Sequence, residues 1–379
     1  MKNALPSLLL VSLTLWSTHA WAANAPVKVS DLDDKAVLLS TKGKGANIDH
    51  IPRSKETKVG IHVVYAPAQN PILKKVHERY KNARVWEKMF EPVNDALKFR
   101  NPTTFLMAEC GAPGAFWNPS TWRMVICYEM VMNAKFAFEA NGVSKQDIDA
   151  KVHGAIVGIA WHEFGHFIAS EFDLPVVGNT EDAADQISTL VLLARNDESV
   201  RMVKAHAEMQ AYVRGDAYTK GVEALLGPAP KRMQTLKAHM ILHSDGRKRR
   251  HNALCLIYGS NPAGYADLVG GNGLHPTRAA RCENEFQSIS RAWTKLIMPH
   301  SYPPSEIAKK RCTLATHVIL ALMRSSGAPA KILQDAQKGK DNDIAKCTAA
   351  YLKDPETTQK AVLCMRYAKT FAEARACKK

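Results

Sequence analysis

The sequence predicts an α+β protein with a small β-containing N-terminal lobe, a mainly helical C-terminal lobe and a C-terminal helical extension. Three observations support this fold class. The runs typical of strands all lie before about residue 130, and segments with helical spacing dominate after it. Residues 298–304 hold three prolines, which indicates a linker before the extension. The 379 residues are enough to build two lobes with sizeable cores.

The first 22 residues are typical of a secretory signal. Lys2 gives a basic start, residues 8–16 form a short apolar core, and residues 20–22 read Ala-Trp-Ala, a small-residue cleavage site. No later apolar stretch reaches the roughly 20 residues that a membrane-spanning helix needs. Residues 23–57 are polar and lack periodicity, so we expect a loosely ordered lead-in. The sequence therefore predicts a periplasmic or secreted protein without a transmembrane segment.

The next segments are assigned by their periodicity, in chain order. Strands are predicted over residues 58–66, 103–109 and 122–129, with a helix over 71–91 between the first two. Helical spacing then recurs over residues 130–141, 146–171, 181–195, 198–217, 231–259 (interrupted near 245) and 277–297. Residues 58–300 are expected to form one domain, with helix 146–171 at a cleft between its two lobes. Residues 305–379 are expected to add three or four short amphipathic helices.

The chain has eight cysteines, all after the first 22 residues, and this even number suits an oxidising compartment. None is arranged as Cys-x-x-Cys, which argues against a thiolate zinc site. Cys110 and Cys127 flank a short segment that a disulfide would staple, and we expect this pair. Cys255 and Cys282 lie in successive helical segments. The other four cysteines fall in the last quarter, and spacing alone leaves the connectivity open.

The net charge is +15, and the residues from 304 onward hold fifteen Lys/Arg against seven Asp/Glu. One interpretation of this basic, cysteine-containing module is that it binds an anionic envelope partner, such as lipid headgroups, wall polymers or an acidic protein. The other is that it presents an ordinary solvated basic face. Aromatic residues do not interleave with the denser basic run 247–250, and an exported location also argues against nucleic-acid binding.

The most informative motif is His162-Glu163-Phe164-Gly165-His166 within an apolar, helix-like run. Histidines four residues apart lie on one face of a helix, so His162 and His166 can bind a single Zn²⁺. Glu163 would lie beside the metal, where it can take a proton from an activated water. Two imidazoles and a carboxylate are costly in an apolar helix unless something pairs with them. The motif therefore predicts a zinc site with Glu163 as general base.

The third ligand must come from further along the chain. Ala169 and Phe172 stand where a longer His-x-x-Gly-x-x-His motif would need Gly and His, and Glu171 lies too far around the helix. Thr180 is expected to cap a second helix, on which residues 181 and 185 share one face. Glu181 is expected to complete a His₂Glu site, and Asp185 to accept the outer N–H of His162. Helix N-terminal charge alone is the alternative explanation of this acidic pair.

These motifs resemble those of the thermolysin-like zinc peptidases. The upstream Gly-Ala-Phe-Trp-Asn at 114–118 is similar to their edge-strand segment, although Gly114 replaces an expected Asn. The chain is still more similar, over roughly residues 58–300, to an uncharacterised bacterial family of metallopeptidase-like proteins. That similarity rests on Cys-Tyr-Glu at 127–129, Glu-Asp-x-Ala-Asp-Gln at 181–186, His-Ser at 243–244 and Asn-x-x-Cys-x-x-Tyr-Gly at 252–259.

The resemblance implies a zinc-dependent peptidase that binds its peptide or protein substrate along the edge strand, through Ala115, Phe116 and Trp117. It also implies a residue that stabilises the oxyanion, for which His243 is the candidate and His239, one turn earlier, the competitor. Two alternatives remain open from the sequence. One is a zinc amidase acting on cell-wall peptides, and the other is a non-catalytic envelope-binding protein with a vestigial metal site, against which the intact Glu163 argues.

Overall fold

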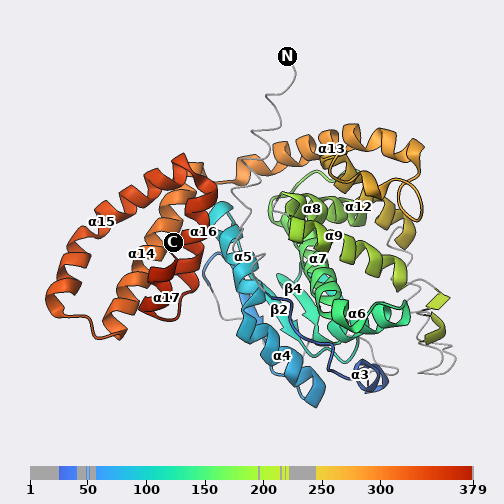
Figure 1. The fold of residues 1–379 in the computed structure, drawn as a ribbon, viewed down its shortest axis with the longest axis horizontal. Coiled ribbons are helices and arrows are strands. Elements are labelled where there is room, and N and C mark those ends of the chain that lie inside the picture. Colours follow the sequence, from blue (N-terminus) through green and yellow to red (C-terminus); the bar gives the residue numbers. More distant parts are fainter. Residues whose placement is uncertain are drawn as a thin grey trace. The chain divides into compact units, whose positions relative to one another are not determined.

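The computed structural model describes residues 25–40, 48, 51, 57–194, 197–213, 216–217, 219–221 and 245–377. It confirms the α+β fold class, because a small mixed sheet is combined with many helices (Figure 1). The chain folds into two compact units, each with most of its contacts within itself. One contains residues 25–87 and 99–297, and the other contains residues 88–98 and 298 onward. Within the described part, no helix is both long and apolar enough to cross a membrane.

The first unit is built on a four-stranded sheet of β1 (Gly60–Tyr65), β2 (Pro102–Ala108), β3 (Ala115–Asn118) and β4 (Arg123–Cys127). The strand order is β1-β2-β4-β3; β1, β2 and β4 are parallel, and β3 runs antiparallel to β4. All residues of β4 are buried, as expected of a strand that lies inside a sheet. The short β3 therefore forms one edge of the sheet, where its outer main-chain groups are not used by another strand.

Two of the predicted elements near the sheet need correction. The predicted helix 71–91 is two helices, α4 (Pro71–Ala83) and α5 (Val85–Ala96), because Arg84 between them adopts φ of 50° and ends the first helix. The predicted strand 122–129 ends at Cys127, and the next residue begins α6 (Tyr128–Ala140).

The predicted loose lead-in is wrong for residues 25–40. Val27, Val29 and Leu32 are buried, and a helix, α3 (Asp34–Ser40), follows them. The carboxylate of Asp149 accepts hydrogen bonds from the amides of Val29 and Ser30, at 2.6 and 2.8 Å. The buried apolar residues of this segment are unevenly spaced. Packing therefore fixes the chain here, although the sequence shows no helical or strand period.

After α6, the first unit continues with the helices α7 (Lys145–Glu171), α8 (Thr180–Leu193), α9 (Asp197–Tyr212), α12 (Gly246–Ser260) and α13 (Pro276–Ile297). A 3₁₀ turn, Ala266–Leu268, follows α12, and another, Met298–His300, begins the C-terminal part of the second unit. The central α7 packs against α6, α8, α9 and strands β3 and β4, and most of its residues are buried. The first part of the predicted helix 231–259 lies outside the described residues.

The second unit combines the later part of α5 with α14 (Pro304–Ser325), α15 (Ala330–Lys353), α16 (Pro355–Tyr367) and α17 (Phe371–Ala376). Two arginines of the extension bind α5. The fully buried Arg311 donates to the Pro92 carbonyl at 3.2 Å, and Arg366 lies 2.6 Å from Asp95 and 3.0 Å from Glu91. The C-terminal helices therefore share a core with a segment from far earlier in the chain.

All eight cysteines form disulfides: Cys110–Cys127, Cys255–Cys282, Cys312–Cys347 and Cys364–Cys377. The predicted Cys110–Cys127 pair is confirmed. It joins the loop after β2 to the end of β4 and thereby closes the segment that contains the edge strand.

Candidate metal centre

The central helix α7 carries the two histidines and the glutamate of the motif. It begins after Ser144, whose side chain accepts a hydrogen bond from the Asp147 amide, and continues for 27 residues. His162 and Glu163 are buried, and His166 is half-buried. The two imidazole rings lie one turn apart, with centroids 4.8 Å from each other. The helix thus places both imidazoles on one side, as the four-residue spacing predicts.

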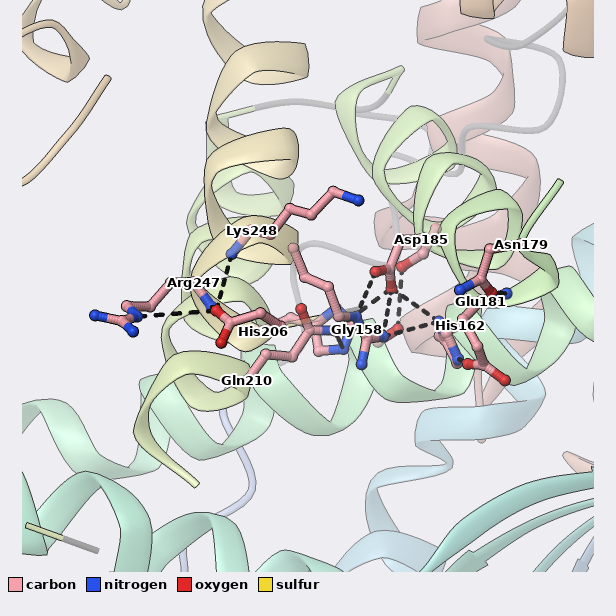
Figure 2. Close-up of polar contacts among 12 residues, drawn as sticks. Gly158, His162, Asn179, Glu181, Asp185, His206, Gln210, Arg247 and Lys248 are labelled. Atoms are coloured by element: carbon pink, nitrogen blue, oxygen red, sulfur yellow. Dashed lines mark hydrogen bonds and ion pairs between the residues drawn. The ribbon is translucent and has the colours of Figure 1, made fainter. Parts of the chain in front are cut away.

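The second helix of the site, α8, brings a carboxylate to the two imidazoles. Its N-cap is Asn179, not the predicted Thr180, because the Asn179 side chain accepts a hydrogen bond from the Glu181 amide at 2.8 Å. This cap fixes the first turn of α8 and the position of Glu181 within it. Asp185 follows one turn later on the same face, and Figure 2 shows both carboxylates directed toward His162.

Three potential ligand atoms form a compact triangle. The Nε2 atom of His162 lies 3.0 Å from Oε2 of Glu181 and 3.2 Å from Nε2 of His166, and the third side, from His166 to Glu181, is 3.4 Å. Zinc bonds of about 2.0–2.1 Å in a tetrahedral site place neighbouring ligand atoms about 3.3–3.4 Å apart. One side of the triangle equals this separation and the other two are slightly shorter, so small side-chain shifts would let the three atoms hold a tetrahedral zinc ion. A tetrahedral ion with three protein ligands would have one further position for another donor.

The lone pairs of the three ligand atoms also favour the binding of a cation between them. Nδ1 of His162 lies 2.9 Å from Oδ1 of Asp185, which suits an N–H donated to that carboxylate. The Nε2 atom then presents a lone pair toward another carboxylate and another imidazole. Burial alone would lower the pKa of His162, but the hydrogen bonds to Asp185 and Glu181 outweigh it and raise the pKa to about 9. The site thus attracts positive charge, which a metal ion or a proton can supply.

Arg249 holds the carboxylate behind His162 and was missed as a site residue by the sequence reasoning. Its Nε and Nη2 atoms donate to the two oxygens of Asp185 at 2.6 and 2.7 Å, a bidentate pair. Burial alone would raise the pKa of Asp185, but the Arg249 charge and the hydrogen bonds from Arg249 and His162 hold it far below its usual value. Arg249 lies seven residues, about two helical turns, before the buried Leu256, so both lie on the apolar face of α12. A charged residue on that face is the sequence feature that could have indicated its buried role.

Helix α9 adds two more residues that the sequence did not indicate, His206 and Gln210. His206 is buried, and burial lowers its pKa to about 3, so its ring is neutral. Its Nε2 lies 2.9 Å from the Gln210 amide nitrogen, and Gln210 also lies 3.4 Å from Asp185 (Figure 2). A side chain on Gly158 of α7 would come within 2.4 Å of His206, so α7 needs glycine at this position.

Glu163 lies beside the triangle and outside it. Burial raises the pKa of its carboxyl group, although the charges of His162 and His166 and a hydrogen bond from the Trp117 main-chain amide oppose this. The Trp117 contact links the candidate base directly to the edge strand β3. The structure therefore brings His162, His166 and Glu181 together, with Glu163 close enough to interact electrostatically with all three.

The edge strand presents alternate residues toward α7. Gly114 accepts a hydrogen bond from the Cys127 amide, so the alternation of an antiparallel ladder directs the main-chain groups of Ala115 and Trp117 away from β4. The Trp117 indole also donates to Ser170 of α7 at 3.1 Å. Phe116 instead pairs with β4 through its main chain, and its side chain packs on the opposite face of the sheet. The structure therefore does not bring Phe116 to the site, in contrast to the prediction.

Several other candidates can be assigned or set aside. Glu171 is not a ligand, because its carboxylate accepts hydrogen bonds from the main chain and side chain of Asn101. Cys110, Cys127 and Glu129 form a second compact group, but the two sulfurs are joined in a disulfide and are not available as thiolates. His243 and its competitor His239 lie outside the described residues.

Comparison with known proteins identifies a family. No curated protein and no solved structure matches the chain. A family model described as "Putative metallopeptidase" matches residues 65–297, which include both motif helices and the edge strand. The match covers more than half of the chain. The chain therefore belongs to this metallopeptidase family.

Proposed function

We propose that the protein is a zinc-dependent peptidase in which His162, His166 and Glu181 hold the metal. Family membership indicates metal-dependent peptidase activity without specifying the metal or the residues that act. The observation that carries the finer proposal is the triangle of ligand atoms, with sides of 3.0, 3.2 and 3.4 Å, because it suits the tetrahedral geometry of zinc. Two imidazole nitrogens and one carboxylate oxygen are also the donor set of catalytic zinc sites in peptidases.

A zinc ion held by His162, His166 and Glu181 would supply Lewis-acid chemistry, that is, a lowered pKa of a bound water molecule, about 7, and polarisation of a carbonyl oxygen. In this proposal Glu163 would take the proton of the attacking water molecule and deliver a proton to the leaving amine nitrogen. Its burial favours the protonated carboxyl group, which supports the second of these roles. Asp185, held by Arg249, keeps the His162 ring oriented through Nδ1.

The edge strand supports an extended peptide as substrate. The outward main-chain groups of Ala115 and the carbonyl of Trp117 are directed away from β4, and β3 contacts α7 beside Glu163. A peptide that pairs with such an edge gains main-chain hydrogen bonds, so side-chain pockets are left to decide specificity. The side chain of Trp117 has a different role, because it anchors β3 to α7 through Ser170.

An exported location, periplasmic or secreted, is part of the proposal. The four disulfides support it, because disulfides form and persist in oxidising compartments. The predicted signal over residues 1–22 lies outside the described part of the chain.

The test separates metal binding from catalysis. Purified protein should contain about one zinc per chain by elemental analysis and should hydrolyse casein or a small peptide. Glu181→Gln should lose the metal, whereas Glu163→Gln should keep the metal and lose hydrolysis. Asp182→Asn, next to Glu181 in α8, is the matched control and should keep both.

A protein that holds no stoichiometric transition metal, or a Glu163→Gln variant with full activity, would overturn the proposal. Cleavage of muropeptides without cleavage of casein would favour the amidase alternative. Zinc binding without any hydrolysis would favour the non-catalytic alternative.

A further inference from the structure

Helix α15 leaves most of its surface uncovered. Of its 24 residues, only Ile344 and Tyr351 are buried. It packs against α14 and α16 on one side, where Cys347 is joined to Cys312 (Figure 1). Its main packing contacts among the described residues are with these two helices.

Four lysines form a row along this uncovered surface. Lys331, Lys338, Lys346 and Lys353 are separated by seven, eight and seven residues, so at about 100° per residue they fall within an arc of about 80°. The helical rise places neighbouring positions about 10–12 Å apart and the outer two about 33 Å apart. All four are exposed, and no ion pair joins any of them to another described residue. Their charges are therefore available to a partner.

The arc that holds the four lysines contains few acidic, aromatic or exposed apolar residues. Asp335 is the one acidic residue of α15 that falls within it, while Lys340 lies on the opposite side. The aromatic residue of this helix, Tyr351, is buried and cannot stack on a nucleobase. Of the two strongly exposed apolar residues of α15, Ile332 and Leu352, neither lies at the centre of the row, so the helix lacks the broad apolar face of a lipid-inserting helix.

We propose that the lysine row of α15 binds a linear polyanion, a chain that carries a repeated phosphate, sulfate or carboxylate charge. A straight row of single charges about 33 Å long matches an extended charged chain along its whole length. The unit adds a general attraction, because residues from 304 onward carry fifteen Lys/Arg against seven Asp/Glu. The row is independent of the metal centre, so this binding does not depend on the proposed hydrolysis.

The experiment uses the whole protein and heparin oligosaccharides as the probe, with affinity measured by calorimetry across a range of salt concentrations. The row variant replaces Lys331, Lys338, Lys346 and Lys353 by Gln. A control variant removes the same number of charges from other exposed positions of the unit, at Lys309, Lys360, Lys369 and Arg375. Both variants have the same net charge, so only the position of the removed charges differs.

The row variant should lose most of the affinity, and its plot of log affinity against log salt should flatten by about 3, or roughly 0.7 for each lysine that no longer meets an anionic group. The control variant should lose far less. Asp335→Asn should bind more tightly than the unchanged protein, because it removes a negative charge from the row. Unfolding temperatures of all variants should be unchanged, since every altered side chain is exposed.

Equal reductions of affinity in the row and control variants would overturn the proposal, since they would show attraction by total charge alone. The proposal would also fail if Asp335→Asn had no effect on binding. Anionic vesicles provide the other arm: if the row variant lost vesicle binding but kept heparin binding, the row would be a lipid contact and not a polyanion site.

Discussion

Removing the guanidinium of Arg249 should weaken both the fold and the metal centre. We choose Arg249→Met, which keeps an unbranched side chain of similar length in α12 and removes the charge. The change leaves the carboxylate of Asp185 without its bidentate partner, whose two hydrogen bonds are 2.6 and 2.7 Å long. The side chains of Arg249 and Asp185 are only 8% and 18% exposed, so water cannot fully replace those hydrogen bonds.

The magnitude follows from this burial. Breaking a buried ion pair by removing one partner costs about 3–5 kcal/mol, and the partial exposure of Asp185 places the expected destabilisation at the lower end, about 3 kcal/mol. Because Asp185 orients His162, the affinity for zinc should also fall, by roughly 10–100-fold. Both effects come from one ion pair, although they are measured separately.

The unfolding free energy should be measured by urea titration with a chelator present, so that weaker metal binding does not contribute. Zinc affinity is measured by competition with a chromophoric chelator. Arg247→Met is the matched control, because Arg247 lies two residues earlier in the same helix and its side chain is 85% exposed. It should change stability by less than about 0.5 kcal/mol. If both variants behaved alike, the inferred role of Arg249 would be wrong.

Three further predictions concern other parts of the chain. Replacing Cys110 and Cys127 together by Ala should cost about 3 kcal/mol of unfolding free energy, because the disulfide closes a 17-residue separation, and proteolysis of the β3 segment should quicken. Burial raises the pKa of Glu129 from 4.5 to about 7, so the folded state binds one more proton than the unfolded state between these pH values. The unfolding temperature should therefore fall as the pH rises through this range, and it should fall less in Glu129→Gln. A chain ending at Pro304 would lack the buried Arg311 and the partly buried Arg366, which neutralise Asp95 and its neighbours on α5. Its unfolding temperature should therefore drop by several degrees or more, and an unchanged temperature would show that the extension is dispensable.

The fold class could be predicted because each part of the chain has a clear period. The strand-like runs and the long helical segments are correct to within one or two residues for β1, β2, α7, α8 and α13. The errors occur where a helix ends, or a segment becomes ordered, without a residue type that indicates it in the sequence. Arg84 adopts a left-handed conformation that usually favours glycine or asparagine, so the end of α4 carried no signal. Residues 25–40 are fixed by tertiary packing, which a local pattern does not reveal.

The candidate site was predictable where a fixed spacing determines geometry. His162 and His166 are four residues apart on one helix, and Glu181 and Asp185 repeat that spacing on the next, so the sequence alone places each pair on one face. The supporting residues could not be found in this way. His206 comes from a third helix and reaches the site only through the packing of α9 on α7, which requires Gly158.

The arginines show why a charge count misjudges this chain. In one unit Arg249 neutralises Asp185 across 64 residues of sequence, and in the other Arg366 pairs with Asp95 across 271. The completely buried Arg311 lies 3.6 Å from the same aspartate. These guanidinium groups are internal and paired, as suits a planar group that is weakly hydrated and binds carboxylates by two hydrogen bonds. The exposed lysines of α15, by contrast, keep their hydrated charges at the surface. The basic excess of the C-terminal segment therefore has two parts: Arg311 and Arg366 neutralise α5, and exposed lysines of α15 are available to a partner. Substituting the arginines tests folding, and substituting the lysines tests binding.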